Sequence, residues 1–146
     1  PVSVLPELFV QTGHGCTVVK NSPYLEKDRK IDDLGDEMSD VVFQLIIIGN
    51  MYNFDFENYQ SEKIYNATLE DLIIVIGQLS EAVMENCGHR FEKARQGFST
   101  TLDFIKFKIK QSFDIVFEIT KLFDLKLEVE YQKMIDSANN WLDKNY

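Results

Sequence analysis

Glu37 and Asp40 lie three residues apart at the head of a strongly apolar run, the segment DEMSDVVFQLIIIGN that spans residues 36–50. On a helix, side chains at this spacing share one face. Two convergent carboxylates are a natural start for a Mg²⁺ site, because Mg²⁺ takes oxygen ligands. The ion would hold phosphate oxygens and activate a water for phosphoanhydride cleavage. The alternative is a solvated pair that matches the helix dipole, which is the commoner meaning of acids in a first helical turn.

A basic loop is the second candidate for binding chemistry, because Arg90, Lys93 and Arg95 follow one another closely in an otherwise acidic chain. An Arg side chain binds phosphate through two parallel hydrogen bonds. Arg90 and Lys93 are therefore candidate substrate-binding residues. The alternative is a solvated run of charge.

The two cysteines lie in a mirrored pair of tripeptides, His14-Gly15-Cys16 and Cys87-Gly88-His89. Together the tripeptides would supply a Cys₂His₂ set for zinc, although each half is tighter than the usual ligand spacing. A cysteine nucleophile with a histidine base has no support from neighbouring residues. The simpler prediction is two unpaired thiols in a reducing cytoplasm, because two cysteines are too few for a disulfide scaffold.

The elements that position these residues are predicted to be helices, and no segment gives a convincing strand. Apolar residues recur at three- and four-residue steps, which outweighs the β-branched runs at 41–42 and 46–48. Thr68 and Asp71 resemble a capping box, and Thr100 opens a second helix in the same way. We expect helices over about 31–52, 56–66, 69–86, 101–123 and 128–144, with a loop over 88–99.

The hydrophobic content of 45% predicts one domain, residues 1–146, and the helical periodicity predicts that this domain is all-α. The net charge of −9 argues against duplex DNA and anionic membranes as partners, since both attract clustered Lys and Arg. No apolar block approaches the roughly 20 residues that a membrane-spanning helix needs. We therefore expect a cytoplasmic protein with a small-molecule ligand.

The chain also repeats itself. Asp40-Val-Val-Phe matches Asp114-Ile-Val-Phe, and upstream Val10–His14 can be laid on Ile74–Gln78. These matches predict two copies of a helix–loop–long helix–short helix unit, over about 1–66 and 67–146. Such a unit cannot bury its apolar faces alone, so two copies related by a pseudo-twofold axis would form one helical bundle.

This organisation resembles the MazG-like all-α nucleoside triphosphate pyrophosphohydrolases. Their E-x-x-D pair and trailing helix look like EMSDVVFQL and FDFENYQSEKIYN here, and VQTGHGCTVVK lies where the family has its E-x-x-E helix. A chain with two copies is similar to the dimeric dUTPase and dCTPase branch. The resemblance implies hydrolysis of a (d)NTP to (d)NMP and pyrophosphate with Mg²⁺ or Mn²⁺, catalysis by Glu37 and Asp40, and a homodimer as one possible assembly. By position, Lys63 and Asn66 match the family's nucleotide-binding Lys and Asn.

The departures from the family pattern concern its first acidic pair. Gln11 and His14 stand at the E-x-x-E positions, so the implied metal ligands are Gln11, His14, Glu37 and Asp40. The loss of two anionic oxygens weakens Mg²⁺ binding, and an imidazole suits Mn²⁺ or Zn²⁺ better. In the second copy, one carboxylate remains among Val75, Gln78, Gln111 and Asp114. Two hypotheses follow: a metal-dependent hydrolase, or a catalytically decayed nucleotide-binding or protein-interaction module.

Overall fold

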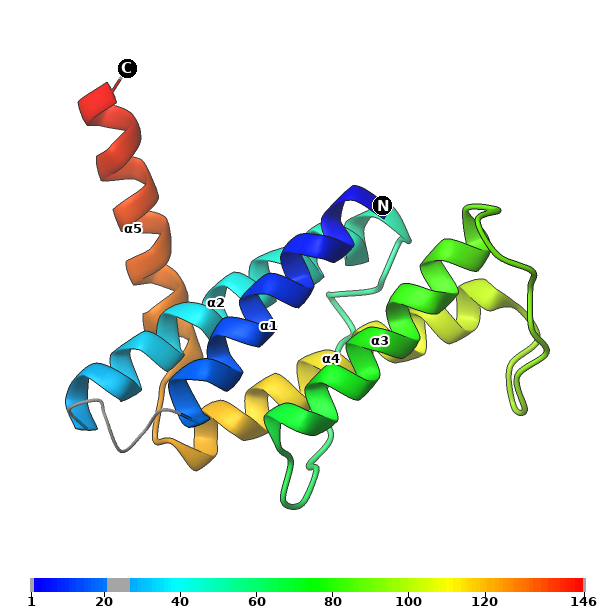
Figure 1. Cartoon of the computed structure of the whole chain (residues 1–146), viewed down its shortest axis with the longest axis horizontal. Helices are drawn as coiled ribbons and strands as arrows, with labels where there is room; N and C mark the ends of the chain where they lie inside the picture. Colours follow the sequence, from blue (N-terminus) through cyan, green and yellow to red (C-terminus); the bar gives the residue numbers. More distant parts are fainter. Residues whose placement is uncertain (1, 21–26, 146) are drawn as a thin grey trace.

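The computed structural model describes residues 2–20 and 27–145, and these residues form helices and connections with no strand (Figure 1). The predicted all-α class is therefore confirmed. A 3₁₀ turn, η1, precedes the first α-helix. The elements are η1 (Val2–Val4), α1 (Leu5–Lys20), α2 (Lys27–Met51), α3 (Leu69–Asn86), α4 (Thr101–Leu122) and α5 (Leu127–Asn145). Within these residues, no helix is both long and apolar enough to cross a membrane.

Two helices begin at the capping residues that the sequence predicts. The Thr68 hydroxyl accepts a hydrogen bond from the Asp71 backbone N–H, and the Asp71 carboxylate accepts one from the Thr68 backbone N–H. Thr100 likewise accepts from the backbone N–H of Asp103 at the start of α4. These bonds satisfy N–H groups that the first turn of a helix leaves without partners, and they fix where α3 and α4 begin.

Four helices enclose the core. α1 packs along α2 and α3 packs along α4, and the two pairs meet through contacts of α2 with α4 and of α1 with α3. The apolar stripe of α2 lies in the centre of this bundle with no exposed surface. Its members are Leu34, Met38, Val41, Leu45 and Ile48. This segment is therefore helical despite its β-branched residues, because the three- and four-residue spacing places the apolar side chains on one helix face.

The connection from α2 to α3, residues 52–68, contains turns and irregular backbone, so the predicted short helix over 56–66 was wrong. Phe54, Phe56 and Tyr59 all pack against Phe113 of α4, with ring centroids 5.6–6.1 Å from that of Phe113. On a helix, residues 54 and 56 would point to opposite sides. These contacts hold the three partly buried rings against α4, in a connection whose backbone is not helical.

Asp114 holds the same connection in place. Its buried carboxylate accepts hydrogen bonds from the Tyr59 hydroxyl at 2.8 Å and from the Glu62 backbone N–H at 3.1 Å. A second backbone-to-side-chain bond runs from the Asn58 N–H to the Asp55 carboxylate at 3.1 Å. A helix over 56–66 would bond the Glu62 N–H internally, so its bond to Asp114 favours the turn over the helix.

The last helix leaves the bundle. α5 contacts α2 near its own first turns and then projects away from the other helices (Figure 1). Of the residues of α5, all of which are described, Leu127 alone is buried. Tyr131 packs partly buried against the core and Glu130 lies against Gly35, whereas residues 136–145 are exposed and lack the tertiary packing that stabilises most helices in proteins.

Candidate functional site

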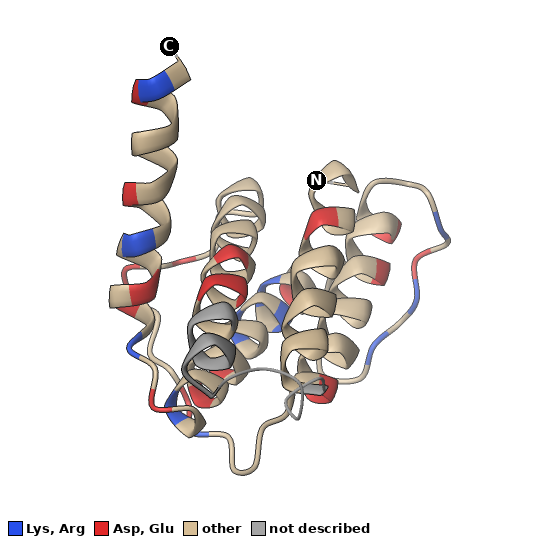
Figure 2. Cartoon of the chain, turned by 60° about the vertical axis from the view of Figure 1, so that its left-hand side comes forward, with Lys and Arg blue, Asp and Glu red and all other residues tan. Residues whose placement is uncertain are grey.

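The candidate site is a group of acidic side chains where α1 lies against α2, which we call the acidic cluster: Glu7, Asp36, Glu37 and Asp40. Figure 2 shows the acidic segments of α2 directly after its grey first turns. Gly15 allows the close approach of the two helices, because a Cβ there would lie 2.9 Å from the Met38 methyl carbon and 3.9 Å from the Glu37 Cβ. Because Gly15 has no side chain, α1 can pack close to α2 at Glu37.

His14 of α1 lies against Glu37 of α2. The His14 Nδ1 lies 3.4 Å from the Glu37 Oε2. The imidazole is 57% exposed, whereas the Glu37 side chain is only 18% exposed. The carboxylate is therefore the buried member of the pair, and the imidazole reaches it from the solvent side.

Burial is the main influence on both carboxylates of the α2 pair. Desolvation raises the pKa of Glu37, which His14 lowers and the charges of Asp40 and Asp36 raise further. Desolvation also raises the pKa of Asp40, and the charges of Asp36 and Glu7 add to the increase. The ionised cluster is therefore under electrostatic strain that a bound cation would relieve.

One oxygen of the cluster lacks a hydrogen bond. Among the described residues, the buried Glu37 Oε2 makes no hydrogen bond of normal geometry, and its ion-pair partner is the His14 Nδ1 at 3.4 Å. An unsatisfied buried acceptor fits a cation ligand, and the carboxylate oxygens and imidazole nitrogen of the cluster fit Mg²⁺ or Mn²⁺ chemistry. However, no three ionisable ligands among the described residues are already close enough together to hold an ion.

Gln11 has a different partner. Its amide donates a 2.7 Å hydrogen bond to the Glu7 Oε1, one turn earlier on the same helix. This contact runs along α1 and leaves Gln11 linked to the acidic cluster through Glu7. Of the four implied metal ligands, His14 therefore contacts Glu37, and Asp40 interacts with both through its charge. Gln11 lies next to Glu7.

Lys63 and Asn66, the predicted nucleotide-binding pair, both lie exposed in the connection before α3. The Lys63 ammonium stands 4.8 Å from the centroid of the Tyr65 ring. Asn66 has a positive φ of 56°, a turn conformation that Asn tolerates well. The next helix begins at Leu69, whose side chain would contact a Cβ at Gly15. Asn66 thus leads into the part of α3 that adjoins the acidic cluster.

Arg90 and Lys93 lie in the connection from α3 to α4 and pair with an acid of α3. The Lys93 ammonium is 2.5 Å and the Arg90 guanidinium 3.7 Å from the Glu81 Oε1. Lys93 lowers the pKa of Glu81, first through its hydrogen bond and then through its charge. Glu81 belongs to the second half of α3, about 18 Å along the helix from Leu69. The structure therefore does not bring Arg90 and Lys93 to the acidic cluster.

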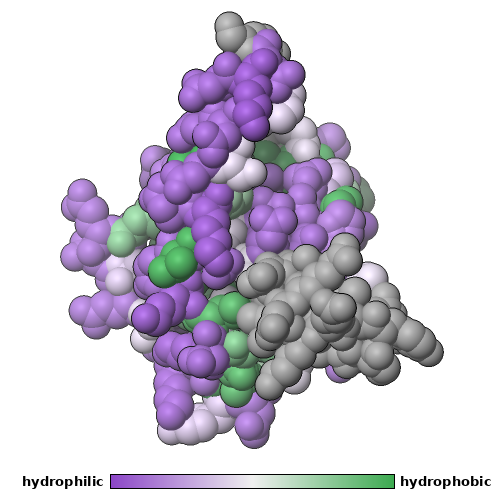
Figure 3. Space-filling view, turned by 90° about the vertical axis from the view of Figure 1, so that its left-hand side faces the viewer, coloured by the Kyte–Doolittle hydropathy of each residue, from purple (hydrophilic) through white to green (hydrophobic). Residues whose placement is uncertain are grey.

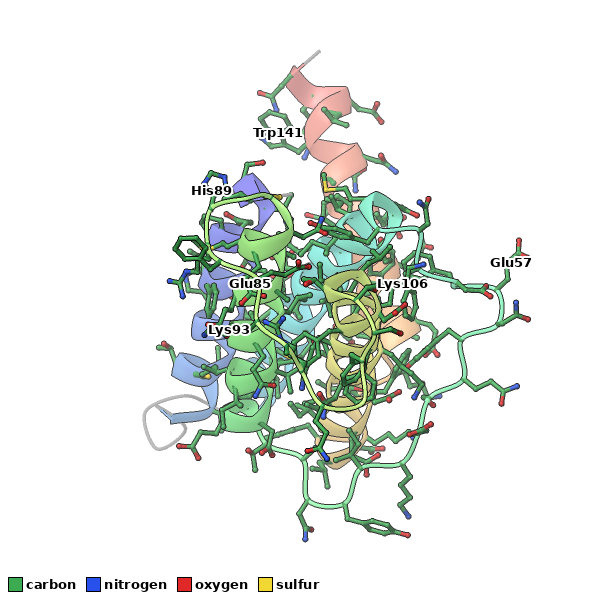
Figure 4. The ribbon with its side chains drawn as sticks, turned by 90° about the vertical axis from the view of Figure 1, so that its right-hand side faces the viewer. Glu57, Glu85, His89, Lys93, Lys106 and Trp141 are labelled. Carbon is green, nitrogen blue, oxygen red and sulfur yellow. The ribbon has the colours of Figure 1, made fainter. Side chains whose placement is uncertain are left out.

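Two buried polar groupings were not identified from the sequence. The fully buried Glu85 binds Arg95 at 2.7 Å, and the Arg95 guanidinium lies 4.2 Å from the Phe104 ring (Figure 4 labels Glu85 beside the α3–α4 connection). Asp114 is bonded by Lys110 at 2.9 Å in addition to the α2–α3 connection. Their partners lie on separate elements, so sequence spacing carries little signal of either grouping beyond the Lys110–Asp114 step within α4.

The proposed zinc set is ruled out by the length of α3. Cys16 is close enough to Glu70, in the first turn of α3, for that charge to help raise the cysteine pKa, although burial is the larger cause. Cys87 caps the opposite end of the same helix. An 18-residue helix is about 27 Å long. Both cysteines are free thiols, as predicted.

Comparison of the chain with family models, curated proteins and solved structures finds no match.

Proposed function

We propose that this chain is a divalent-cation-dependent nucleotide pyrophosphohydrolase of the MazG-like kind, which cleaves a (d)NTP to (d)NMP and pyrophosphate. Glu37 and Asp40 hold the Mg²⁺ or Mn²⁺ ion, and His14 stands at the edge of its site. The observation that supports this most strongly is the buried Glu37 Oε2, which lies within a cluster of carboxylates and, among the described residues, has only the 3.4 Å contact with His14.

The physical argument begins with desolvation. A partly buried carboxylate next to other carboxylates is costly to ionise, and pairing with a cation offsets that cost. The raised pKa values of Glu37 and Asp40 express this cost. The ion, when bound, would polarise the phosphoanhydride and supply an activated water. Exposed Lys63 and Asn66 are available to contact the nucleotide from the start of α3.

The proposal includes duplication of a helix pair, with one copy in about residues 1–66 and the other in about 67–146. In support, α1 with α2 and α3 with α4 are both packed pairs, and Asp40 and Asp114 begin similar apolar runs. The absence of a helix over 56–66 limits the shared unit to the helix pair. α5 is then an addition at the end of the second copy.

The second candidate function is binding of a nucleotide without hydrolysis. Asp114, the counterpart of Asp40, is fully engaged by Lys110, Tyr59 and the Glu62 backbone, so it stabilises the fold. A carboxylate that was once catalytic would lose its function in this way. This observation favours a loss of chemistry in the second copy. A similar loss in the first copy would leave a chain that binds a nucleotide without hydrolysis.

Pyrophosphate release distinguishes the two candidates. We expect the parent chain to release pyrophosphate from at least one dNTP in the presence of Mn²⁺, and more slowly with Mg²⁺, because His14 replaces an oxygen ligand. Asp40→Asn should reduce the rate at least about 100-fold, an effect typical of removing a metal ligand or its support. The control Glu57→Gln, at an exposed position in the α2–α3 connection, should retain the parent rate.

Three outcomes are informative. Release that depends on Asp40 supports the hydrolase. Cation-dependent nucleotide binding without release supports the non-catalytic module. Release that is equal in the parent and in Asp40→Asn would contradict both the assigned site and the proposed reaction.

A further inference from the structure

A pocket lies in the connection from α3 to α4, at the opposite end of α3 from the acidic cluster. It has a volume of about 260 Å³ and is lined by residues 92–95 and 98–101. Drug-sized ligands occupy pockets of about 300–1,000 Å³, so this pocket fits a smaller molecule. Leu69, which adjoins the acidic cluster, lies about 24 Å along α3 from Glu85. The pocket is therefore separate from the proposed cation site.

Arg95 connects this pocket to a buried carboxylate. Arg95 lines the pocket, and its Nη1 donates a 2.7 Å hydrogen bond to the Oε2 of Glu85, whose side chain has no exposed surface. The Arg95 guanidinium also lies 4.2 Å from the centroid of the Phe104 ring. Figure 4 shows Glu85 and Lys93 beside this connection at the end of α3. The wall of the pocket thus includes one member of a buried ion pair.

The ion pair leaves one donor and one acceptor free. A guanidinium and a carboxylate commonly form two parallel hydrogen bonds, but here the contact uses Nη1 and Oε2 alone. The Arg95 Nη2 and the Glu85 Oε1 are both buried and, among the described residues, have no hydrogen-bond partner. Buried polar atoms are nearly always hydrogen-bonded. A free donor and a free acceptor on the same pair therefore indicate a ligand that bonds to both.

We propose that this pocket binds a small, planar, neutral ligand with a hydrogen-bond acceptor next to an N–H donor, as on a cyclic amide or the edge of a nucleobase. The acceptor of the ligand bonds to the Arg95 Nη2, and its N–H bonds to the Glu85 Oε1. Glu85 and Arg95 neutralise each other, which favours a neutral ligand over an ion. The ligand reaches the two buried atoms through a shift of the Arg95 side chain, which belongs to an irregular connection and not to a helix.

The ring of Phe98 favours a planar ligand in the same pocket. Phe98 lines the pocket and packs against Phe104 and Phe107, with ring centroids 5.1 Å apart in both pairs. These contacts hold the Phe98 ring at the wall. An aromatic wall offers a flat apolar surface on which a planar ring can stack. The pocket therefore combines an apolar face with a polar donor and acceptor.

An apolar groove at the foot of α5 lacks such a polar pair. None of its lining atoms is among the buried unpartnered atoms of the described residues. Its lining is Val42, Ile46, Phe117, Leu127, Glu128 and Tyr131. Figure 3, which looks onto one side of α5, shows apolar patches below the helix and a mostly hydrophilic face along it. Apolar surface alone does not select one ligand chemistry, whereas Glu85 and Arg95 do.

Two related lactams test this inference. 2-Pyridone is a planar ring with a C=O acceptor next to an N–H donor, and N-methyl-2-pyridone has the same ring without the donor. In NMR titrations of the full chain with chelator present, we expect 2-pyridone to shift the backbone amide signals of residues 92–101 in a saturable way. N-methyl-2-pyridone should bind at least about tenfold more weakly, because it leaves the Glu85 Oε1 without a partner. Adenine extends the test to a nucleobase with the same kind of edge.

The possible outcomes separate a ligand site from a hydrated ion pair. No saturable shift with 2-pyridone or adenine would mean that water alone satisfies the free atoms, which would overturn the proposal. Equal affinity for the two lactams, or shifts confined to other parts of the chain, would also overturn it. The chelator removes any cation from the acidic cluster, so these results do not depend on the proposed hydrolase activity.

Glu85→Gln tests the assigned acceptor. The Gln oxygen accepts from Arg95, and its NH₂ group then meets the N–H of the ligand, so 2-pyridone should bind at least about tenfold more weakly. Glu57→Gln, the same substitution at an exposed position, is the matched control and should retain the parent affinity. Circular dichroism verifies folding, and if Glu85→Gln does not fold, the two lactams with the parent chain decide. A folded Glu85→Gln variant with the parent affinity would exclude Glu85 as the acceptor.

Discussion

Asp40 and Asp114 begin almost the same tetrapeptide, but their surroundings differ. Asp40 lies among other acids, and burial raises its pKa. Asp114 lies 4% exposed and accepts bonds from Lys110, Tyr59 and the Glu62 backbone. Because both oxygens of the Asp114 carboxylate accept bonds from the protein, Asp114 contributes to stability, whereas Asp40 remains available for a ligand.

The network of Asp114 predicts a loss of stability when its charge is removed. Asp114→Asn should lower the free energy of unfolding by about 1–3 kcal/mol, because an amide cannot accept all three bonds and leaves a buried group unsatisfied. Chemical denaturation of the parent and the variant measures this difference. Glu57→Gln is the exposed control, and an Asp114→Asn variant as stable as this control would show that the network is dispensable.

The acidic cluster predicts that the stability of the cation-free protein depends on pH. Raised pKa values mean that the folded state binds protons more tightly than the unfolded state. In chelator-treated protein, the contribution of Glu37 and Asp40 therefore favours folding at low pH. This contribution is lost as the pH rises above their ordinary pKa values of 4.5 and 3.8 and through their raised pKa values.

Asp40→Asn isolates this effect. The variant should be more stable than the cation-free parent at pH 7, and the difference should shrink as the pH falls toward 4, because the parent carboxyl becomes neutral there. Denaturant titrations at several pH values with chelator present measure the difference. If Asp40→Asn instead destabilises the cation-free protein at pH 7, then Asp40 makes a favourable contact that the charge argument omits.

At the scale of the elements, residues with local signals were predictable. The Thr68–Asp71 and Thr100–Asp103 pairs fixed the starts of α3 and α4, because a cap acts within one turn. The segment 56–66 was not predictable in this way. Its conformation depends on Phe113 and Asp114, which lie far along the chain on α4. Propensity gave a helix there, and tertiary contacts prevailed.

The candidate site shows the same division. The helical spacing of Glu37 and Asp40 placed them on one face, and the resemblance placed His14 nearby, where the structure has it in contact with Glu37. The association of Gln11 with Glu7 was not foreseen, although the four-residue spacing permits it. The pairing of Arg90 and Lys93 with Glu81 depends on the path of a long connection, which no local pattern encodes.

Two helical glycines give a matched test of helix packing. A Cβ at Gly49 would lie 2.4 Å from the Phe56 ring, whereas a Cβ at Gly13 meets nothing within 4 Å. Gly49→Ala should therefore destabilise the fold by about 1–3 kcal/mol through overpacking. Gly13→Ala should stabilise it by about 0.5–1 kcal/mol, because alanine is the better helix former. Thermal or denaturant unfolding compares the two.

The double variant Gly49→Ala with Phe56→Leu identifies the cause. A smaller side chain at position 56 should relieve the clash, so the two changes together should cost less than the sum of each alone. Additive effects would mean that Phe56 does not restrict position 49.

At the scale of the whole molecule, the charge distribution favours a cation over an anion as the ligand. The chain has 24 acidic and 15 basic residues. The most basic connection is compensated internally, because Arg90 and Lys93 pair with Glu81 and Arg95 pairs with Glu85. Among the residues whose side chains the structure describes, His14 is the ion-pair partner of the acidic cluster. The described part of the acidic cluster therefore carries more negative than positive charge, which favours a divalent ion there.

Calorimetric titration of the parent chain with Mn²⁺, repeated with Asp40→Asn and with Glu57→Gln, tests the central claim most directly. We predict saturable binding at one site in the parent and in Glu57→Gln, weaker binding of Mg²⁺ to the same site, and at least about tenfold weaker Mn²⁺ binding in Asp40→Asn, as is typical when a site loses a ligand or its support. Equal Mn²⁺ affinity in the parent and in Asp40→Asn, or no saturable binding in the parent, would contradict the assignment of Glu37 and Asp40 as a cation site.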